Sequence, residues 1–184
     1  MASPSGYFCS PKAKIVSDRF HVIRLILYHF MEFCKGVQEG VRWNRKTTYP
    51  LRKRKDRLKP QDKERLKSFF KENSAIELAY EFKEKLCELL NKKSQTAKQC
   101  KDNIKKLKEM MKTMRYEAPI EFGKLAETIS EWFTPIIRMW RYTKNNGITE
   151  GFHRKMKLIQ RRAYGYRNFE NYRLRVLVEC GVNL

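Results

Sequence analysis

The chain has 184 residues, and its 41 Lys and Arg residues against 20 Asp and Glu give a formal net charge of +21 at pH 7. Such an excess attracts polyanions and makes binding strongly dependent on salt, so nucleic acid is the expected partner and an anionic membrane surface the weaker alternative. The length fits one domain of ordinary size, and 41% hydrophobic residues suffice for a core.

The cysteine pattern argues against structural zinc and against export. None of the five cysteines stands in a C-x-x-C pair, and no histidine follows at zinc-finger spacing. An odd count with irregular spacing is typical of reduced thiols in a cytoplasmic chain. The most apolar stretch, residues 20–34, is interrupted by charged residues and histidines, so the sequence predicts neither a signal peptide nor a membrane span.

The first predicted elements are a short strand at about residues 13–16 and a helix over residues 20–34. Apolar residues recur in this helix at three- and four-residue steps, which predicts one buried stripe covering the edge of a sheet. The stripe consists of Phe20, Ile23, Leu27, Phe30 and Cys34. Asp18 is either the N-cap of this helix or a functional carboxylate. His21 lies one turn further on, close enough to share a ligand or a hydrogen bond with Asp18.

Residues 42–65 are extremely basic, and two aromatic residues, Trp43 and Tyr49, stand among the cations. Pro50 and Pro60 bracket a predicted loop. The segment either contacts the backbone of DNA or forms a solvated basic linker, since runs of charge usually stay solvated.

Three helices are predicted next, at about residues 61–73, 74–91 and 96–115. Ser74 and Glu77 are expected to form a capping box at the start of the second. Its apolar face comprises Ile76, Leu78, Phe82, Leu86, Leu89 and Leu90. The apolar face of the third comprises Ile104, Leu107, Met110, Met111 and Met114. A further long apolar helix follows Pro119, and Pro135 should kink or break it.

Residues 145–175 combine a turn, one acidic residue and a strongly basic segment. Asn145, Asn146 and Gly147 favour a turn, and Thr149 is expected to cap a helix whose first turn holds Glu150. The cations that follow are Arg154, Lys155, Lys157, Arg161, Arg162, Arg167, Arg173 and Arg175. Aromatic residues are interspersed with them, which is typical of nucleic-acid surfaces. A last helix is predicted over residues 169–180.

Glu150 has two interpretations. As an acid in a first turn it can simply favour the helix dipole, by about 0.3–1 kcal/mol. A carboxylate among phosphate-binding cations otherwise repels phosphate, unless it holds a divalent metal ion that the phosphate also contacts. The spacing alone favours the first interpretation and leaves Glu150 as a candidate metal ligand.

Two segments resemble the bacterial insertion-sequence transposases of the ISL3 group, which carry a DDE catalytic domain with an RNase H-like fold. The C-terminal segment starts at Asn146 and reads NG-x-x-EG, followed by K-x-K-x-x-x-RRAYG-x-RN-x-x-N-x-R-x-R. The other segment, residues 11–22, is similar to the part of the family in which the last core strand leads into an Asp-Arg-Phe-His motif. Asp18 and His21 carry that motif here.

The resemblance implies that Glu150 is the third catalytic acid and a ligand of Mg²⁺ or Mn²⁺, with Asp18 and His21 as neighbours of the active site. It implies that the eight cations named above bind DNA. The implied fold is mainly α: the C-terminal portion of an RNase H-like α/β DDE domain, with a helical insertion and few or no strands. Two-metal phosphoryl transfer needs several carboxylates, and the family's two catalytic aspartates precede the matched segment. We therefore expect a truncated fragment, catalytically incomplete by itself.

Three regions are expected: a remnant of the core at 1–41, a basic loop and helical insertion at 42–118, and C-terminal helices with the Glu motif at 119–184. The expected function is DNA cleavage and strand transfer. The expected partners are transposon ends, a second copy or a full-length transposase, and no membrane. Two alternatives stay open. One is a non-catalytic helical protein that binds nucleic acid, and the other is a helical interaction fragment with only nonspecific adhesion.

Overall fold

The structure is a computed structural model that describes residues 14–142 and 147–181, and these residues contain helices and no β-strand. This confirms the prediction of a mainly α fold. Contacts divide the chain into two units, residues 1–143 and residues 144–184. The three regions expected from the sequence stay a prediction.

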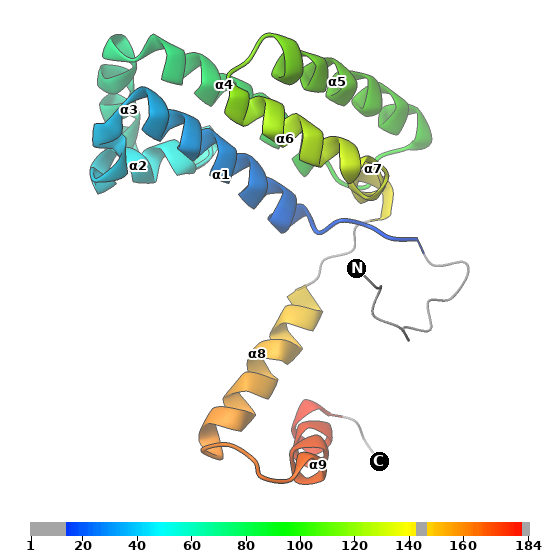
Figure 1. Cartoon of the computed structure of the whole chain (residues 1–184). Helices are drawn as coiled ribbons and strands as arrows, with labels where there is room; N and C mark the ends of the chain where they lie inside the picture. Colours follow the sequence, from blue (N-terminus) through cyan, green and yellow to red (C-terminus); the bar gives the residue numbers. More distant parts are fainter. Residues whose placement is uncertain (1–13, 143–146, 182–184) are drawn as a thin grey trace. The chain divides into compact units, whose positions relative to one another are not determined.

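Four long helices of the first unit form a closed bundle (Figure 1). They are α1 (Arg19–Val37), α4 (Ser74–Asn91), α5 (Ala97–Tyr116) and α6 (Ile120–Glu131). Helix α1 packs against α4, α4 against α5, α5 against α6, and α6 again against α1. Helix α7 (Phe133–Tyr142) lies at one end of the bundle and contacts all four. The break between α6 and α7 falls at Trp132, close to the break predicted at Pro135.

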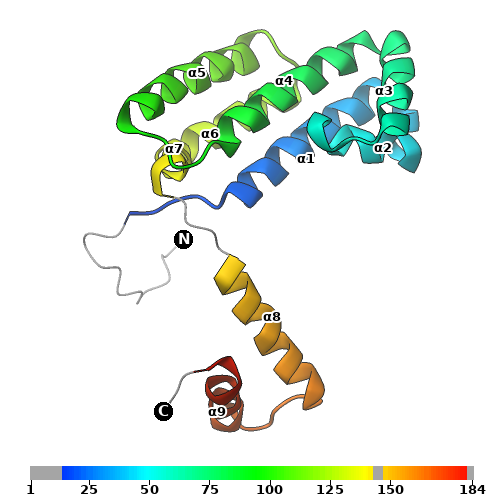
Figure 2. The same cartoon turned by 180° about the vertical axis from the view of Figure 1, so that it is seen from behind.

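Two further helices cover the other end of the bundle (Figure 2). They are α2 (Arg45–Arg52) and α3 (Pro60–Glu72), and the 3-10 turns η1 (Glu39–Arg42) and η2 (Lys55–Arg57) precede and separate them. The loop predicted between Pro50 and Pro60 is present as residues 53–59, which join α2 to α3 and include η2, whereas helix α2 was not predicted. Pro50 lies in the last turn of α2 and is buried, and Pro60 is the first residue of α3. A proline is tolerated at a first helical position because its missing N–H would have no partner there.

The start of α4 differs from its prediction. Ser74 is the first residue of α4 and Asn73 precedes it as N-cap, so the predicted capping box of Ser74 and Glu77 is wrong. A capping box is present at α5 instead. There Thr96 Oγ1 accepts from the Gln99 N–H at 3.3 Å, and Gln99 Oε1 accepts from the Thr96 N–H at 2.9 Å.

The buried face of α1 is rotated from the predicted stripe. Val22, Ile26, Phe30 and Cys34 point into the core, whereas Phe20 is exposed. Apolar residues occupy more than one face of α1, so periodicity permits several stripes, and the positions of α4 and α6 select one of them. Leu78 of α4, also predicted to be buried, is exposed for the same reason.

The segment before α1 contacts α7 and no strand. The Ser17 N–H donates to the Pro135 carbonyl at 3.1 Å, and Arg138 donates to the Ile15 carbonyl at 3.3 Å. The predicted strand is therefore wrong over residues 14–16, because α7 takes the backbone groups that a sheet would use; residue 13 lies outside the described residues. The sheet edge that α1 was expected to cover is likewise not among the described elements, and α1 packs on helices.

Two buried cations tie helix ends to the bundle. The first is Arg19, whose Nε donates to the Leu90 carbonyl at 3.0 Å. Its Nη2 donates to the Lys92 carbonyl at 2.9 Å and to the Met139 carbonyl at 3.2 Å. Arg19 thus joins the start of α1 to the C-terminal ends of α4 and α7.

The second buried cation is Lys83 of α4, which is 1% exposed. Its Nζ donates to the Leu51 carbonyl at 2.9 Å and the Lys53 carbonyl at 3.4 Å, and it lies 2.8 Å from Glu84 Oε1. The other oxygen of Glu84 accepts from the Lys55 N–H at 2.8 Å. Burial lowers the pKa of Lys83, and the hydrogen bond to Glu84 opposes that shift. This network fastens the C-terminal end of α2 to α4.

Within the described ranges, every helix is too short or too polar to cross a membrane.

Candidate catalytic carboxylate and nucleic-acid interface

The second unit is a pair of helices, α8 (Gly147–Arg162) and α9 (Phe169–Cys180), packed against each other. Helix α8 begins before Thr149, so the predicted cap at Thr149 is wrong. The predicted turn residues Asn145 and Asn146 lie outside the described residues. Helix α9 has the predicted bounds, and its N-cap Asn168 accepts from the Glu170 N–H at 2.8 Å.

A tight turn ends α8 and directs the chain into α9. The Gly165 N–H donates to the Gln160 carbonyl at 3.1 Å, and the Tyr164 N–H donates to the Arg161 carbonyl at 3.2 Å. These two bonds form a Schellman motif, in which one residue adopts the left-handed conformation. That residue is Tyr164, with φ of 51°, and Gly165 follows with φ of 99°. The Tyr164 side chain is fully exposed at the tip of the turn.

Helix α8 carries a line of charged residues on one face. Arg154, Lys157 and Arg161 follow Glu150 at steps of four, three and four residues, a spacing that places all four on the same face. We call Arg154, Lys157 and Arg161 the α8 stripe. Its three cations span about 10 Å along the helix axis, a length over which one DNA strand carries about three phosphates.

The eight predicted DNA-binding cations fall into two groups. Within the described residues, Arg173 is paired with Glu170 at 2.8 Å and Arg175 with Glu179 at 2.6 Å, while Lys155 donates to the Glu179 carbonyl. The others have no acidic partner among the described residues and are exposed: Arg154, Lys157, Arg161, Arg162 and Arg167. The pairs of Arg173 and Arg175 lie about one turn apart within α9, a spacing that is visible in the sequence, whereas the contact of Lys155 with Glu179 depends on how α9 packs against α8.

Glu150 lies in the first turn of α8 and is exposed. An acid four residues before an arginine on a helix commonly forms an ion pair with it. No such pair joins Glu150 and Arg154 in this structure, and among the described residues the Glu150 carboxylate has no partner. The carboxylate is therefore free to accept an external ligand.

The described residues do not complete a metal site by themselves. No group of three or more His, Cys, Asp or Glu within the described ranges could hold a metal ion. Mg²⁺ and Mn²⁺ take several oxygen ligands, and an exposed carboxylate such as Glu150 can supply one of them. The chemistry of Glu150 thus fits one ligand of a larger set.

Asp18 and His21, in the first unit, are brought together as expected. Asp18 Oδ1 accepts from the Phe20 N–H at 3.0 Å, which makes Asp18 the N-cap of α1. Its other oxygen lies 3.0 Å from Nδ1 of His21. The cap interpretation of Asp18 is confirmed. Because both oxygens are engaged in the first turn of α1, a role of the pair near an active site stays a prediction.

The residue missed in this motif is Arg19, which stands between the cap and the histidine. It contacts three carbonyls from two helices, as described above. No local signal distinguishes it from the chain's exposed arginines, since its partners are 71 to 120 residues away in sequence. Lys83 did have a signal, because it stands between Ala79 and Leu86 on the apolar face of α4.

These features describe a helical protein with free cations on an exposed face, as expected of a protein that handles DNA. A family model described as transposase, the DDE transposases of the ISL3 group, matches residues 8–176. The chain therefore belongs to this transposase family, which confirms the resemblance of its two motifs. Its function is related to transposition, and its family implies DNA as a partner. Searches of curated proteins and of solved structures found no match.

Proposed function

We propose that this chain contributes to DNA cleavage and strand transfer by holding transposon DNA on the second unit, with Glu150 as one ligand of the catalytic metal ions. The observation that carries the proposal is the α8 face, where an unpaired carboxylate precedes three unpaired cations in register. Phosphates bound along the α8 stripe would form a row that ends beside the Glu150 carboxylate.

The charges of this face support contact with a phosphate backbone. Three cations without acidic partners lose no intramolecular ion pair when they bind phosphate, and they release counterions from the DNA. Tyr164 and Phe169, exposed at the turn between the helices, offer rings on which an unpaired base can stack.

The role of Glu150 follows from its place at the end of this stripe. DDE transposases use divalent metal ions, and such ions supply charge stabilisation where a phosphoryl group is transferred. Glu150 would hold an ion beside the bound backbone, while carboxylates from a second polypeptide would complete the site. We propose that the 184 residues alone are catalytically incomplete.

The α8 stripe gives the first test. Arg154→Gln/Lys157→Gln/Arg161→Gln should reduce the slope of log affinity against log salt by about 2.7, because each phosphate contact in duplex DNA contributes about 0.9. Fluorescence anisotropy of a labelled terminal-inverted-repeat duplex, titrated over a series of salt concentrations, measures this slope.

A matched control removes three cations that are already engaged. Lys155→Gln/Arg173→Gln/Arg175→Gln lowers the net charge equally, but these side chains bind Glu170 and Glu179 groups. Its slope should fall by less than half as much, with circular dichroism to verify that both variants keep their helices. Equal slopes in the two variants would show that only the net charge matters.

Glu150 gives the second test. Mn²⁺ should raise the DNA affinity of the unmodified chain, because Glu150 would hold the ion and its positive charge would offset the repulsion between the carboxylate and phosphate. Glu150→Gln should abolish this increase, as measured by the same anisotropy titration with and without Mn²⁺. An identical change in DNA affinity on adding Mn²⁺ to both proteins would show that Glu150 is not a metal ligand.

The same two proteins, incubated with Mg²⁺ or Mn²⁺, should neither nick the duplex nor join its ends. Metal-dependent cleavage by the unmodified chain that Glu150→Gln abolishes would establish Glu150 as catalytic and overturn the proposed incompleteness. Cleavage that survives Glu150→Gln would contradict both the assignment of Glu150 and the incompleteness.

A further inference from the structure

A second strongly basic surface lies in the first unit, between α2 and α3. Its side chains line a hollow of about 590 Å³. Arg45, Lys46, Arg52 and Lys59 reach it as exposed cations without an acidic partner among the described residues. We call it the basic hollow. Its one acid, Asp62, is buried and lies 3.6 Å from Arg65, so this carboxylate is already paired.

We propose that the basic hollow is a second nucleic-acid site, which takes the phosphate backbone of DNA independently of α8. The arrangement of its cations supports this choice. Arg45 and Arg52 stand seven residues apart on α2, two turns of the same face, and Lys59 approaches from the segment that begins α3. Cations thus converge on one concavity from both sides, which suits a protruding backbone better than the flat surface of a bilayer.

The hollow is held in shape before any ligand arrives. Leu51 is fully buried, and Lys83 and Glu84 bind backbone groups of Leu51, Lys53 and Lys55 directly after the α2 cations. A solvated linker would have to be ordered on binding, at a cost in conformational entropy. Because α2 is fastened to the bundle, much of that ordering is already present in the free protein.

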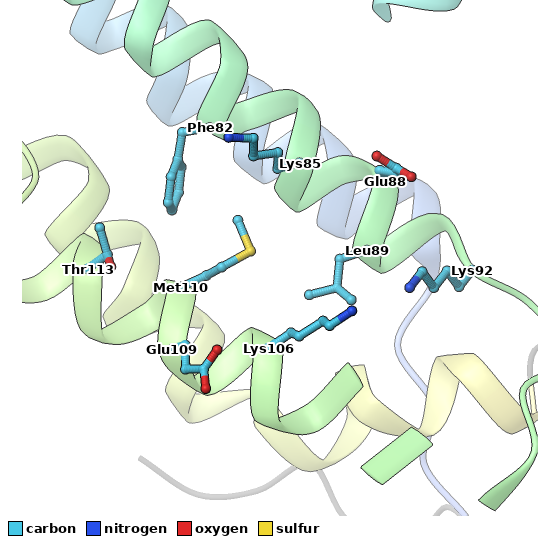
Figure 3. A pocket seen from close by; sticks show the side chains of 9 residues that line it. All are labelled: Phe82, Lys85, Glu88, Leu89, Lys92, Lys106, Glu109, Met110 and Thr113. Atoms are coloured by element: carbon cyan, nitrogen blue, oxygen red, sulfur yellow. The ribbon is translucent and has the colours of Figure 1, made fainter. Parts of the chain in front are cut away.

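A comparable cleft between α4 and α5 lacks this charge pattern. Figure 3 shows the side chains that line this cleft. Its apolar residues are Phe82, Leu89 and Met110, and its charged residues, of both signs, are Lys85, Glu88, Lys92, Lys106 and Glu109. Three lysines face two glutamates there, whereas the basic hollow has five cations and one paired aspartate. The attraction for a polyanion is therefore concentrated at α2 and α3.

Two variants with equal charge separate the hollow from a general charge effect. Arg45→Gln/Arg52→Gln should lower the salt slope for a labelled duplex by about 1.8, or 0.9 for each lost phosphate contact. The control, Lys85→Gln/Lys106→Gln in the α4–α5 cleft, should lower it by less than half as much. All four side chains are exposed, so both variants are expected to keep their helices, as circular dichroism would verify.

Combination with the α8 variant distinguishes this site from the proposed function. The losses from Arg45→Gln/Arg52→Gln and from the α8 stripe should add, since they are in different units. If only the hollow variant lowers the salt slope, the α8 assignment is refuted and the proposal for the hollow is supported. If only the α8 variant lowers it, the proposal for the hollow is refuted. Equal slopes in the hollow and cleft variants would overturn the proposal. The binding of Arg45→Gln/Arg52→Gln to phosphatidylserine vesicles is measured as well. If this variant keeps its duplex binding but loses its binding to the vesicles, the hollow is a membrane-binding surface and the proposal is overturned.

Discussion

Lys83→Met is expected to lower the free energy of unfolding by about 3–5 kcal/mol, the usual effect of removing one member of a buried ion pair. Methionine has a similar length and fills the space between Phe30 and Tyr80, so little of the loss comes from packing. The cost arises because Glu84 loses its cation and the carbonyls of Leu51 and Lys53 lose a charged donor. Urea unfolding followed by fluorescence of the buried Trp140 measures the change in the first unit.

Lys85→Met is the matched control for this prediction. Lys85 is an exposed lysine on the same helix, so its replacement should change the stability by no more than about 0.5 kcal/mol. A loss below about 1 kcal/mol for Lys83→Met would mean that the carbonyls find other donors, and that Lys83 does not hold α2 in place.

Arg19→Met is expected to cost about 3 kcal/mol or more. Hydrogen bonds to charged groups contribute about 1.5–3 kcal/mol each, and Arg19 donates three of them to backbone carbonyls. Burial lowers the pKa of Arg19, and the neighbouring Asp18 opposes that shift. The guanidinium stays protonated at neutral pH, because arginine is effectively always charged in proteins. The same urea titration measures the loss.

Two further variants distinguish geometry from charge at this position. Arg19→Lys keeps the charge, yet a single ammonium lacks the planar fork that serves three carbonyls, so an intermediate loss is expected. Arg24→Met, an exposed arginine on α1, should be close to neutral. If Arg19→Lys is as stable as the unmodified chain, the positive charge alone accounts for the role of Arg19.

Lys83 and Arg19 stabilise parts of the fold that also carry proposed or predicted sites. Lys83 fastens the helix whose arginines line the basic hollow, and Arg19 follows Asp18 and precedes His21 at the start of α1. A motif that resembles a functional signature can therefore contain a structural residue at its centre. In Asp-Arg-Phe-His, the cap and the arginine both have contacts that the fold requires.

Local signals predicted the helices well and their faces less well. Helices α4 and α9 have the predicted bounds, because changes in polarity mark their ends and Asn168 caps the start of α9. Helix α2 in the basic segment was not predicted, since charge and proline argue against a helix locally. Burial of Leu51 and Pro50 against the bundle outweighs that tendency.

The sequence by itself determined the chain's membership of the transposase family, its large positive charge, and its helical character, because these depend on motif residues, composition and local periodicity. The tertiary structure alone decided which cations are free to meet phosphate and which are engaged. Arg154 and Arg173 each follow a glutamate by about one helical turn in the sequence, but only Arg173 is paired with it. Pairing and burial arise from contacts between residues and helices brought together by folding, and composition carries no record of which groups will meet.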